Sequence, residues 1–397
     1  MQELLINVDK DKKNILLVEN GKLIEQYVEE EGKDRLEGNI YLGIVENVLV
    51  GMQAAFVDIG KEKNTFIHIR DVVPKISNET GNKDEDFSNY NINDYLKTGM
   101  PILVQVKKDS TNKKGARISM HLSLPGRFVV LMPNEKFITL SQKIENKEER
   151  DRLKAIVKES LPKGYGAIVR TSAISKNADD IINDVNEVLK KYKKVEESYN
   201  NEIKIENKIK PKLLYKSENI TEKIVIDLMD KDLSKLVTND DKIYNTMKKI
   251  LEYANKDIKL ELKENLLELY GLNKQLEELE NRKVWLKCGG FITIDKTEAL
   301  TAIDVNSGKY TGRKDLEQTI FTVNKEATIE IAKQLRLRDI GGIIIVDYID
   351  MQSKENEDKI IDLFNEQLKK DRSKTQIVGF SKLNLLEMTR KHMCSND

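Results

Sequence analysis

The chain has 397 residues, of which 34% are charged and 39% hydrophobic, as in a charge-rich, folded protein of two to four domains. Lysine plus arginine and aspartate plus glutamate each number 67, so any site for a polyanion requires a local cluster of basic residues. No apolar run approaches the ~20 residues of a membrane helix, and the N-terminus lacks a signal-peptide pattern. Two distant cysteines, Cys288 and Cys394, form neither a CxxC pair nor a disulfide framework. These features predict a reduced, cytoplasmic protein, and only three histidines argue against histidine-centred catalysis.

The first 35 residues predict a β-hairpin, Glu3–Val8 with Asn14–Val18, and a third strand over Lys22–Val28. Three short strands are too few to fold alone, so a partner from elsewhere in the chain is needed. Residues 210–280 mix strands with helices, end in a helical run at Gln275–Glu280, and are the candidate partner.

Residues 36–124 have short candidate strands at regular spacing, with glycines between them. This pattern predicts a small closed barrel, interrupted by a polar loop at Ser77–Asp94. Phe56 and Phe66 fall on neighbouring strands, where aromatic rings either stack on unpaired bases or fill the barrel core. The candidate strands are Ile40–Val50, Ala54–Ile59, Thr65–Ile69 and Ile102–Lys107.

The densest basic cluster of the chain lies at the end of this barrel segment. Basic side chains in a turn-like context contact phosphates in nucleic-acid-binding proteins, but a solvated loop has the same composition and is the simpler interpretation. The cluster comprises Lys107, Lys108, Lys113, Lys114 and Arg117.

Residues 125–209 begin with a strand at Phe128–Pro133 and continue with a helix at Lys147–Leu161. A second strand ends on Arg170 and Thr171, a pair that holds a phosphate in some proteins and forms a surface salt bridge more commonly. A long charged helix from Ala178 to Asn207 is predicted to be a solvent-facing connector.

Two apolar runs in the last third of the chain, Ala299–Ile303 and Ile343–Val346, are each followed by an aspartate, Asp304 and Asp347. Apolar residues recur at helical spacing over Leu316–Leu335 between them. A strand, a helix and a strand form a crossover unit, which lays its strands parallel with like ends together. The pattern therefore predicts that the two carboxylates lie side by side.

Two neighbouring carboxylates suit a hard divalent cation such as Mg²⁺. The alternative is that acids at strand ends cap the turns that follow them. Asp350 lies three residues after Asp347, and we favour a helix N-cap over a supporting role beside the metal, because helical sequence begins soon after it.

The remaining elements of residues 281–397 complete this region. We expect Gly341-Gly342 to end the crossover helix and Gly289-Gly290 to join a strand pair. The expected elements are strands at Lys283–Lys287, Phe291–Ile294 and Gln376–Phe380, a helix at Glu355–Lys370 and a last helix at Leu383–Arg390.

Several long motifs, in order, resemble the bacterial ribonuclease E/G family of endoribonucleases. They are GNIYLGIVENVLVGMQAAFVDIG, GYGAIVRTSA, RKVWLKCGGFITIDKTEALTAIDVNSGK, QTIFTVNKEATIEIAKQLRLRDIGGIIIVDYIDM and LLEMTRK. The similarity runs from near residue 1 to near residue 395. Motifs of this length in this order are highly specific.

The resemblance implies a multidomain α+β and α/β architecture. Residues 1–35 and 210–280 would form a split RNase H-like domain, into which an OB-fold barrel, residues 36–124, is inserted. Residues 125–209 would form a 5′-sensor region, and residues 281–397 a DNase I-like catalytic domain.

The resemblance also implies roles for individual residues. Asp304 and Asp347 would hold one catalytic Mg²⁺, with Asn306 hydrogen-bonded into the same site. The RNA-facing residues of the barrel match Phe56, Phe66 and Lys114. The pocket that recognises a 5′-monophosphate matches Gly126, Val130, Arg170, Thr171 and Lys374, and the last of these replaces a family arginine and loses its bidentate fork.

The implied function is Mg²⁺-dependent cleavage of single-stranded RNA in rRNA and tRNA processing and mRNA decay. The products would carry 5′-phosphate and 3′-hydroxyl ends, and a 5′-monophosphate would stimulate cleavage. The alternative is a non-catalytic protein that binds RNA or ribosomes. A metal phosphatase or DNA nuclease is disfavoured by the barrel.

One departure from the family concerns zinc. Relatives continue past the LLEMTRK motif into a CPxC-type motif that shares zinc between two subunits, whereas this sequence ends HMCSND with Cys394 alone. One thiolate cannot build a closed four-ligand site, so we expect no structural zinc. A homodimer remains compatible with the sequence, but a zinc-linked assembly is in doubt.

Overall fold

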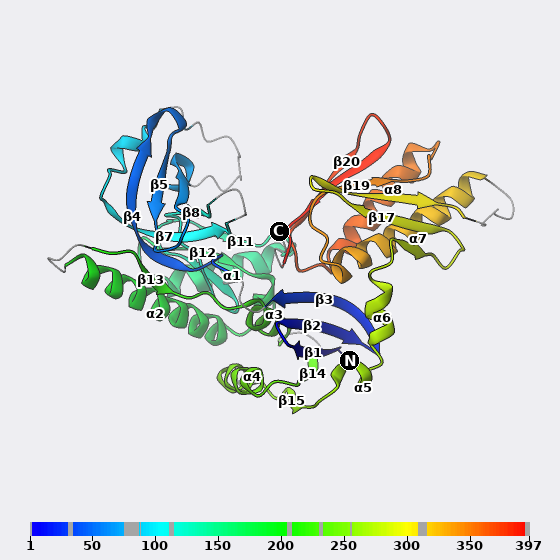
Figure 1. Cartoon of the computed structure of the whole chain (residues 1–397), viewed down its shortest axis with the longest axis horizontal. Coiled ribbons are helices and arrows are strands. Elements are labelled where there is room, and N and C mark those ends of the chain that lie inside the picture. Colours follow the sequence, from blue (N-terminus) through cyan, green and yellow to red (C-terminus); the bar gives the residue numbers. More distant parts are fainter. Residues whose placement is uncertain are drawn as a thin grey trace. The chain divides into compact units, whose positions relative to one another are not determined.

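The computed structural model describes residues 2–30, 35–74, 87, 89–110, 115–204, 209–229, 233–254, 256–308 and 316–393. The chain divides into two compact units, which we describe separately: unit 1 is Met1–Lys33 with Ile220–Asp397, and unit 2 is Asp34–Asn219 (Figure 1). The fold is mixed α and β. Within the described ranges, no helix is both long enough and apolar enough to cross a membrane.

The first sheet of unit 1 joins segments from distant parts of the sequence. The three N-terminal strands form antiparallel pairs as predicted, and β1 pairs in parallel with β14 from beyond residue 230. Both faces of the sheet are buried, because Leu4 and Ile6 contact one hydrophobic cluster while Leu5 contacts another. The strand order is β15-β14-β1-β2-β3, with β1 Gln2–Asp9, β2 Lys12–Glu19, β3 Lys22–Glu30, β14 Leu233–Thr238 and β15 Lys259–Leu262.

Helices α3 to α6 accompany this sheet (Figure 1). Helices α3, Ile220–Leu228, and α4, Asp241–Tyr253, contribute to the cluster that includes Leu4. Helices α5, Leu266–Leu269, and α6, Asn273–Glu278, contribute to the cluster on the opposite face.

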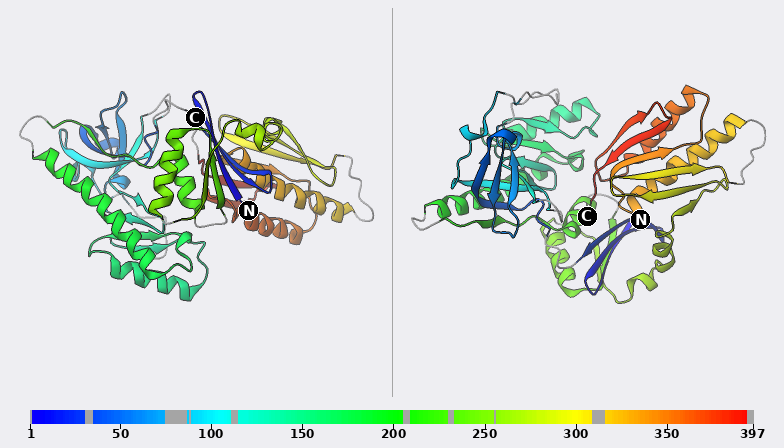
Figure 2. Two further views of the ribbon diagram at one scale, coloured as in Figure 1. Left: turned by 90° about the horizontal axis from the view of Figure 1, so that it is seen from below. Right: turned by 45° about the horizontal axis from the view of Figure 1, so that its top comes forward.

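The second sheet of unit 1 has six strands in the order β16-β17-β18-β19-β21-β20. Strands β18 and β19 are parallel and the other neighbours are antiparallel, as expected for strands joined by a crossover helix. Helices α7, Leu316–Leu337, and α8, Lys354–Leu368, pack on one face (Figures 1 and 2). The strands are β16 Lys283–Trp285, β17 Phe291–Lys296, β18 Leu300–Asn306, β19 Gly342–Asp347, β20 Thr375–Phe380 and β21 Leu385–Arg390.

The predicted last helix at Leu383–Arg390 is wrong, because Leu385–Arg390 is strand β21, which lies between β19 and β20. Burial alternates along it, with Leu386, Met388 and Arg390 inside, which is the period of a strand. A tight turn at Ser381–Asn384, with Asn384 in the left-handed region at φ 59°, joins it to β20. In the sequence, the adjacent residues Leu385 and Leu386 fit the apolar spacing of a helix as well as that of a strand.

Buried charges hold the start of β19 in place. Arg390 is fully buried and its Nε contacts Asp371 Oδ2 at 2.8 Å, while its Nη1 contacts Asp339 Oδ1 at 2.8 Å. The same nitrogen donates a hydrogen bond to the Ile340 carbonyl. Arg390 pairs with Gly342 across the sheet, so the cluster lies where β19 begins.

Unit 2 contains a closed five-stranded barrel, because β4 pairs with both β5 and β7. Its interior is apolar, and β13, Lys212–Tyr215, adds to β4 on the outside. Short 3₁₀ turns lie at Val50–Met52, Ile69–Asp71 and Ile92–Asp94. The predicted loop at Ser77–Asp94 lies largely outside the described residues. The strands are β4 Ile40–Leu49, β5 Ala54–Asp58, β6 Thr65–His68, β7 Pro101–Lys108 and β8 Arg117–Ser119.

A four-stranded sheet, in the order β11-β12-β10-β9, and two helices make up the rest of unit 2. Helix α2, Ala178–Ile203, is not a solvent-facing connector: it buries an apolar stripe that includes Ile181, Val185 and Tyr192 against the sheet. The stripe was masked by the many charges on its other face. The other elements are α1 Lys147–Ser160, β9 Leu124–Pro125, β10 Val129–Met132, β11 Ile138–Leu140, β12 Gly166–Val169 and a 3₁₀ turn at Thr171–Ala173.

Candidate active site

Asp304 and Asp347 lie directly opposite one another on the parallel strands β18 and β19. The flanking residues Ile303, Val305 and Val346 point into the core under α7 and α8. Because side chains alternate along a strand, both aspartates project from the opposite, exposed face. The predicted juxtaposition of the two acids is confirmed at the level of strand register.

Asn306 lies two residues beyond Asp304 on the same face of β18. Its Nδ2 donates a short hydrogen bond to Asp304 Oδ2, which limits the rotation of that carboxylate. Burial, followed by the negative charges of Asp304 and Asp350, raises the pKa of Asp347. The three carboxyl groups thus form a region of concentrated negative charge.

The surroundings of the acid pair fit a hydrated magnesium ion. Within the described part of the chain no ion pair includes Asp304 or Asp347, and the nearby charge of Arg282, which is paired with Asp295, attracts Asp304 at longer range. No group of three or more metal-ligating side chains occurs in the described part of the chain. Mg²⁺ keeps several waters and takes one or two carboxylates plus substrate phosphates, so a pair of carboxylates is a suitable donor set.

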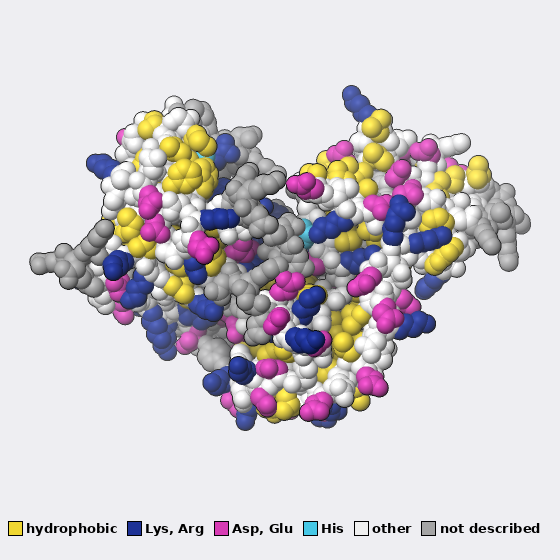
Figure 3. Space-filling view, in the orientation of Figure 1, with side chains coloured by type: hydrophobic (Ala, Val, Ile, Leu, Met, Phe, Trp, Pro, Cys, Tyr) yellow, Lys and Arg dark blue, Asp and Glu magenta, His cyan; other side chains and the backbone are white. Residues whose placement is uncertain are grey.

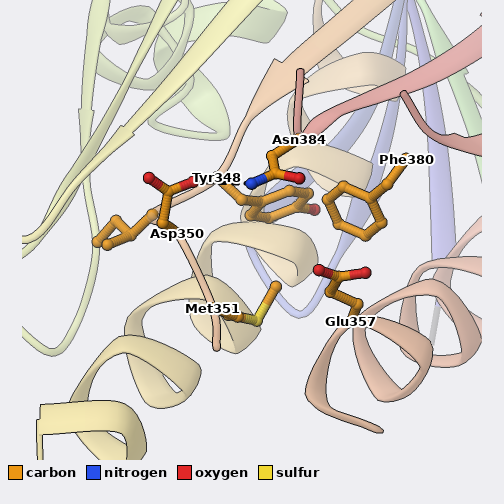
Figure 4. Close-up of a pocket in the computed structure, with 7 residues that line it drawn as sticks. Tyr348, Asp350, Met351, Glu357, Phe380 and Asn384 are labelled. Atoms are coloured by element: carbon orange, nitrogen blue, oxygen red, sulfur yellow. Dashed lines mark hydrogen bonds between the residues drawn. The ribbon is translucent and has the colours of Figure 1, made fainter. Parts of the chain in front are cut away.

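Asp350 does not cap the following helix, which corrects the preferred prediction. The N-cap of α8 is Ser353, and Asp350 instead accepts a hydrogen bond of 3.4 Å from Asn384 Nδ2. A small pocket lies beside it, where Tyr348 and Phe380 have ring centroids 6.1 Å apart (Figure 4). Asp350 therefore belongs to the surroundings of the acid pair, and it contacts the turn between β20 and β21 through Asn384.

An aromatic pair next to the acids was missed by the sequence analysis. Trp285 and Phe291 pair across β16 and β17, and Phe291 pairs in turn with Asn306 on β18. The indole of Trp285 is 63% exposed. Only the strand register reveals this row, although the chain's single tryptophan was a signal in the sequence.

The two barrel phenylalanines lie outside the barrel core. Phe56 and Phe66 are paired across β5 and β6, with ring centroids 6.1 Å apart in an edge-to-face arrangement. Phe56 is 36% exposed, and hydrophobic side chains gather at the surface over β4 and β5 (Figure 3). This surface position removes the alternative that the rings simply fill the core.

The basic cluster is only partly described. Lys113 and Lys114 lie outside the described residues. Lys107 Nζ donates hydrogen bonds to Gln105 Oε1 and Ser123 Oγ, and Arg117 forms an ion pair of 2.8 Å with Asp71. Those two cations have structural partners within the barrel.

Four of the predicted sensor residues lie near the same end of strands β9, β10 and β12. Arg170 Nη1 donates a hydrogen bond of 2.9 Å to the Gly126 carbonyl, and Thr171 follows it at the exposed start of a 3₁₀ turn. Val130 lies on the adjacent strand, opposite Pro125 and Ile168.

The loop that carries Gly126 is organised by Asp184 of α2, a residue that the sequence analysis missed. The Asp184 carboxylate accepts hydrogen bonds from the backbone N–H groups of Arg127, Phe128 and Val129, at 2.7–3.0 Å. A Cβ atom at position 126 would lie 2.6 Å from Asp184 Oδ2, so only glycine fits beside this carboxylate. The sequence does not indicate the contact between Asp184 and this loop, because the partners are 55–57 residues apart in the chain.

Lys374 belongs to unit 1, whereas the other predicted sensor residues belong to unit 2. It is exposed and lines a shallow hollow with Ile343, Gln376 and Lys391. Cys394, which bears on the zinc prediction, lies outside the described residues, and Cys288 is a half-buried free cysteine.

Comparison with known proteins agrees with these features. A family model described as the Ribonuclease E/G family matches residues 123–393. Ribonuclease G of Salmonella typhimurium (strain SL1344) is 36% identical over 397 residues, which cover 98% of this chain and 79% of the relative. Ribonuclease G of Escherichia coli (strain K12) is 36% identical over 400 residues, with the same coverage.

A relative with the other family name is similar over a large part of the chain. Ribonuclease E of Nostoc sp. (strain PCC 7120) is 35% identical over 368 residues, which cover 90% of this chain and 52% of the relative. With the family model and the ribonuclease G relatives, this similarity spans both units. The chain belongs to the ribonuclease E/G family and is an endoribonuclease, an enzyme that hydrolyses phosphodiester bonds within RNA.

Proposed function

We propose that the chain cuts single-stranded RNA in a Mg²⁺-dependent reaction at Asp304 and Asp347 and leaves 5′-phosphate and 3′-hydroxyl ends. Precursors of rRNA and tRNA, and mRNA, are the proposed substrates. The observation that carries the proposal is the register of β18 and β19, which sets two carboxylates side by side on an exposed sheet face.

Hydrolysis of a phosphodiester requires an activated water and neutralisation of charge on the phosphate. A bound Mg²⁺ supplies both, so no histidine is needed. In the proposal Asp304 and Asp347 hold the ion. Asn306 fixes the orientation of the Asp304 carboxylate through its hydrogen bond. The raised pKa of Asp347, caused by burial and then by Asp304 and Asp350, supports an added cation, which would offset this repulsion.

The proposed RNA contacts in unit 2 are Phe56, Phe66 and Lys114. Surface aromatic rings stack on unpaired bases without strong sequence preference, and a lysine adds attraction to the phosphate backbone. The exposure of Phe56 and its edge-to-face packing with Phe66 support this role.

The proposed 5′-monophosphate sensor uses Arg170 and Thr171, with Gly126 and Val130 shaping the surface beside them. A guanidinium and a hydroxyl are suitable phosphate donors. The family resemblance adds Lys374, which offers a point charge in place of an arginine fork.

We further propose that these parts correspond to the family's domains. The first sheet of unit 1 would be the split RNase H-like domain and the second the DNase I-like domain. In unit 2 the barrel would be the OB-fold and the remainder the 5′-sensor region.

A cleavage assay tests the catalytic proposal. Single-stranded RNA with a 5′-monophosphate is incubated with wild type, Asp304→Asn, Asp347→Asn and Asp358→Asn, with Mg²⁺ or with EDTA. Asp358 is an exposed acid on α8, away from the acid pair, and serves as the matched control. Because charge stabilisation by a metal is worth several kcal/mol, each site variant should lose about a thousandfold in kcat and the control should not.

The products and the 5′ end complete the test. Ligation to the cleaved ends should report a 5′-phosphate and a 3′-hydroxyl. RNA with a 5′-monophosphate should be cut faster than the same RNA with a 5′-triphosphate or 5′-hydroxyl. Equal cleavage by wild type and both site variants would contradict the assignment of the acids, and equal rates on all three ends would contradict the sensor.

A further inference from the structure

A row of side chains runs across the exposed face of the catalytic sheet, perpendicular to the strands. Trp285 on β16 pairs with Phe291 on β17, and Phe291 pairs with Asn306 on β18. Residues that are directly opposite share one face of a sheet. The two rings therefore lie on the same face as Asp304, which Asn306 contacts.

The rings of Trp285 and Phe291 pack against each other. Their centroids lie 5.4 Å apart at an interplanar angle of 64°, an edge-to-face arrangement that fixes the rings relative to each other. The residue between Lys283 and Trp285 is Val284, which points inward and packs against the core. The indole thus contributes little to the core of unit 1, and 63% of its surface remains exposed.

Lys283 gives this aromatic pair a positive charge. Its Nζ lies 3.9 Å from the Trp285 ring centroid and 3.5 Å from the Phe291 ring centroid, within cation–π range of both. An exposed aromatic pair with an ammonium group matches the chemistry of single-stranded RNA, which presents the flat face of a base next to a phosphate.

We propose that Trp285 and Phe291 are the platform on which a base of the RNA substrate stacks, beside the scissile phosphodiester, while Lys283 attracts the adjacent phosphate. This inference rests on the proposed catalytic role of Asp304 and Asp347. Trp285 lies two strands away from Asn306, about 10 Å at the usual strand spacing, so a base close to the cleaved bond reaches it.

The platform differs in purpose from the barrel phenylalanines, because it lies on the same sheet as the acids. Rings on that sheet would position the phosphodiester of the RNA next to the carboxylates, rather than simply keep the RNA bound to the protein. Trp285 and Phe291 are therefore positioning residues, and their loss should raise KM and shift the preferred cleavage position.

The single tryptophan of the chain makes a direct test possible, since all indole emission arises from Trp285. Wild-type protein in EDTA, which blocks hydrolysis in the proposed mechanism, is titrated with a dye-labelled single-stranded RNA. Dye anisotropy reports binding and indole emission reports stacking. We expect saturable quenching that follows the anisotropy, and weaker quenching by a duplex of the same sequence, whose bases are already paired.

Activity measurements with substitutions provide the second test. Loss of one stacked base should weaken binding about tenfold to a hundredfold in Trp285→Ala, seen as a higher KM. Trp285→Phe keeps an aromatic face and should recover most of this loss. Leu269→Ala removes a side chain of similar exposure, 59%, on α5 and should behave as wild type.

The outcomes separate the two claims. RNA binding without quenching, or an unchanged KM in Trp285→Ala, would overturn the platform and leave the acid pair intact. Quenching without any cleavage in Mg²⁺ would support the platform as an RNA-binding surface and overturn the proposed catalysis. Absence of RNA binding would overturn both. Self-association through the exposed rings would appear as concentration-dependent emission without RNA, and would also overturn the platform.

Discussion

The two ends of strand β19 carry charge clusters of opposite design. At its start Arg390, fully buried, contacts Asp371 and Asp339, whose side chains are 1% and 11% exposed. At its end Asp347 lies beside Asp304 on the exposed face. Neither acid forms an ion pair within the described residues, and Arg282, which is paired with Asp295, attracts Asp304 only at longer range.

The difference shows how one strand serves both stability and function. A buried cluster must be neutralised by the protein itself, because an uncompensated buried charge costs several kcal/mol. An exposed pair of carboxylates tolerates its repulsion in water and retains the capacity to bind an external cation. The raised pKa of Asp347, caused by burial, Asp304 and Asp350, is the local cost of that arrangement.

The largest expected effect concerns the open end of β19. If Asp304 and Asp347 act on one ion, Asp304→Asn with Asp347→Asn should lose no more activity than either single variant, because residues that act as a unit are strongly non-additive. Single-turnover cleavage in excess Mg²⁺ measures this. Multiplicative losses would show that the two acids act independently.

The next effect concerns the closed end. Arg390→Met should lower the free energy of unfolding of unit 1 by about 3–5 kcal/mol, because it leaves two carboxylates buried without their cation. Urea denaturation measures the change. Arg282→Met is the control, since its ion pair with Asp295 is exposed to solvent and its loss should change the free energy of unfolding far less. Similar losses in both variants would remove the contrast between closed and exposed pairs.

Unit 2 offers a second closed site, in which Asp184 accepts three backbone hydrogen bonds. Asp184→Asn presents an amide to at least one of these N–H groups and should lower the free energy of unfolding by about 1–3 kcal/mol. It should also slow cleavage of 5′-monophosphorylated RNA, because Arg170 contacts the loop that Asp184 holds. Glu187→Gln on the same helix, which removes an exposed partner of Lys190, should change neither quantity measurably.

The smallest effect is a pH dependence. Hydrogen bonds from Arg152 and from the Ser175 backbone lower the pKa of Glu149 to about 2. A carboxyl group whose pKa falls on folding stabilises the protein above its unfolded pKa of about 4.3, and this contribution disappears as the pH falls toward 2. Glu149→Gln should therefore reduce stability at pH 7 and have progressively less effect between pH 4 and pH 2.

Hydrogen exchange of the α1 amides at several pH values measures this contribution. Glu148→Gln removes a carboxylate from the same helical turn and controls for the change in net charge. A pH-independent effect of Glu149→Gln would show that the Arg152 hydrogen bonds do not act through ionisation.

The acid pair was predictable because its determinants are local in sequence. Each aspartate directly follows an apolar run, and the helix between the runs requires parallel strands with like ends together. The N-terminal hairpin and four of the five barrel strands were predictable for the same reason, since alternation and turn residues lie within each segment. The short strand β8, Arg117–Ser119, was missed, because its sequence was assigned to a turn-like basic cluster.

The missed features depend on contacts between distant segments. The sequence of β21 was predicted as a helix because only a few apolar positions distinguish helical from strand spacing in so short a segment. Its pairing with β19 and β20 makes it a strand. The Asp184 interaction joins α2 to a distant loop, and Trp285 reaches the acid pair only through the register of three strands. Asp350 was predicted to be the N-cap because the short polar segment between it and α8 does not show where the helix begins; the N-cap is Ser353.

The most direct test of the central claim locates the cation itself. Crystals of the wild-type protein are soaked in Mn²⁺, which takes the place of Mg²⁺ and scatters anomalously. We predict an anomalous peak within coordination distance of both the Asp304 and Asp347 carboxylates, and its loss in Asp347→Asn. A peak elsewhere on unit 1, or a peak that persists unchanged in Asp347→Asn, would contradict the assignment of this pair as the catalytic metal site.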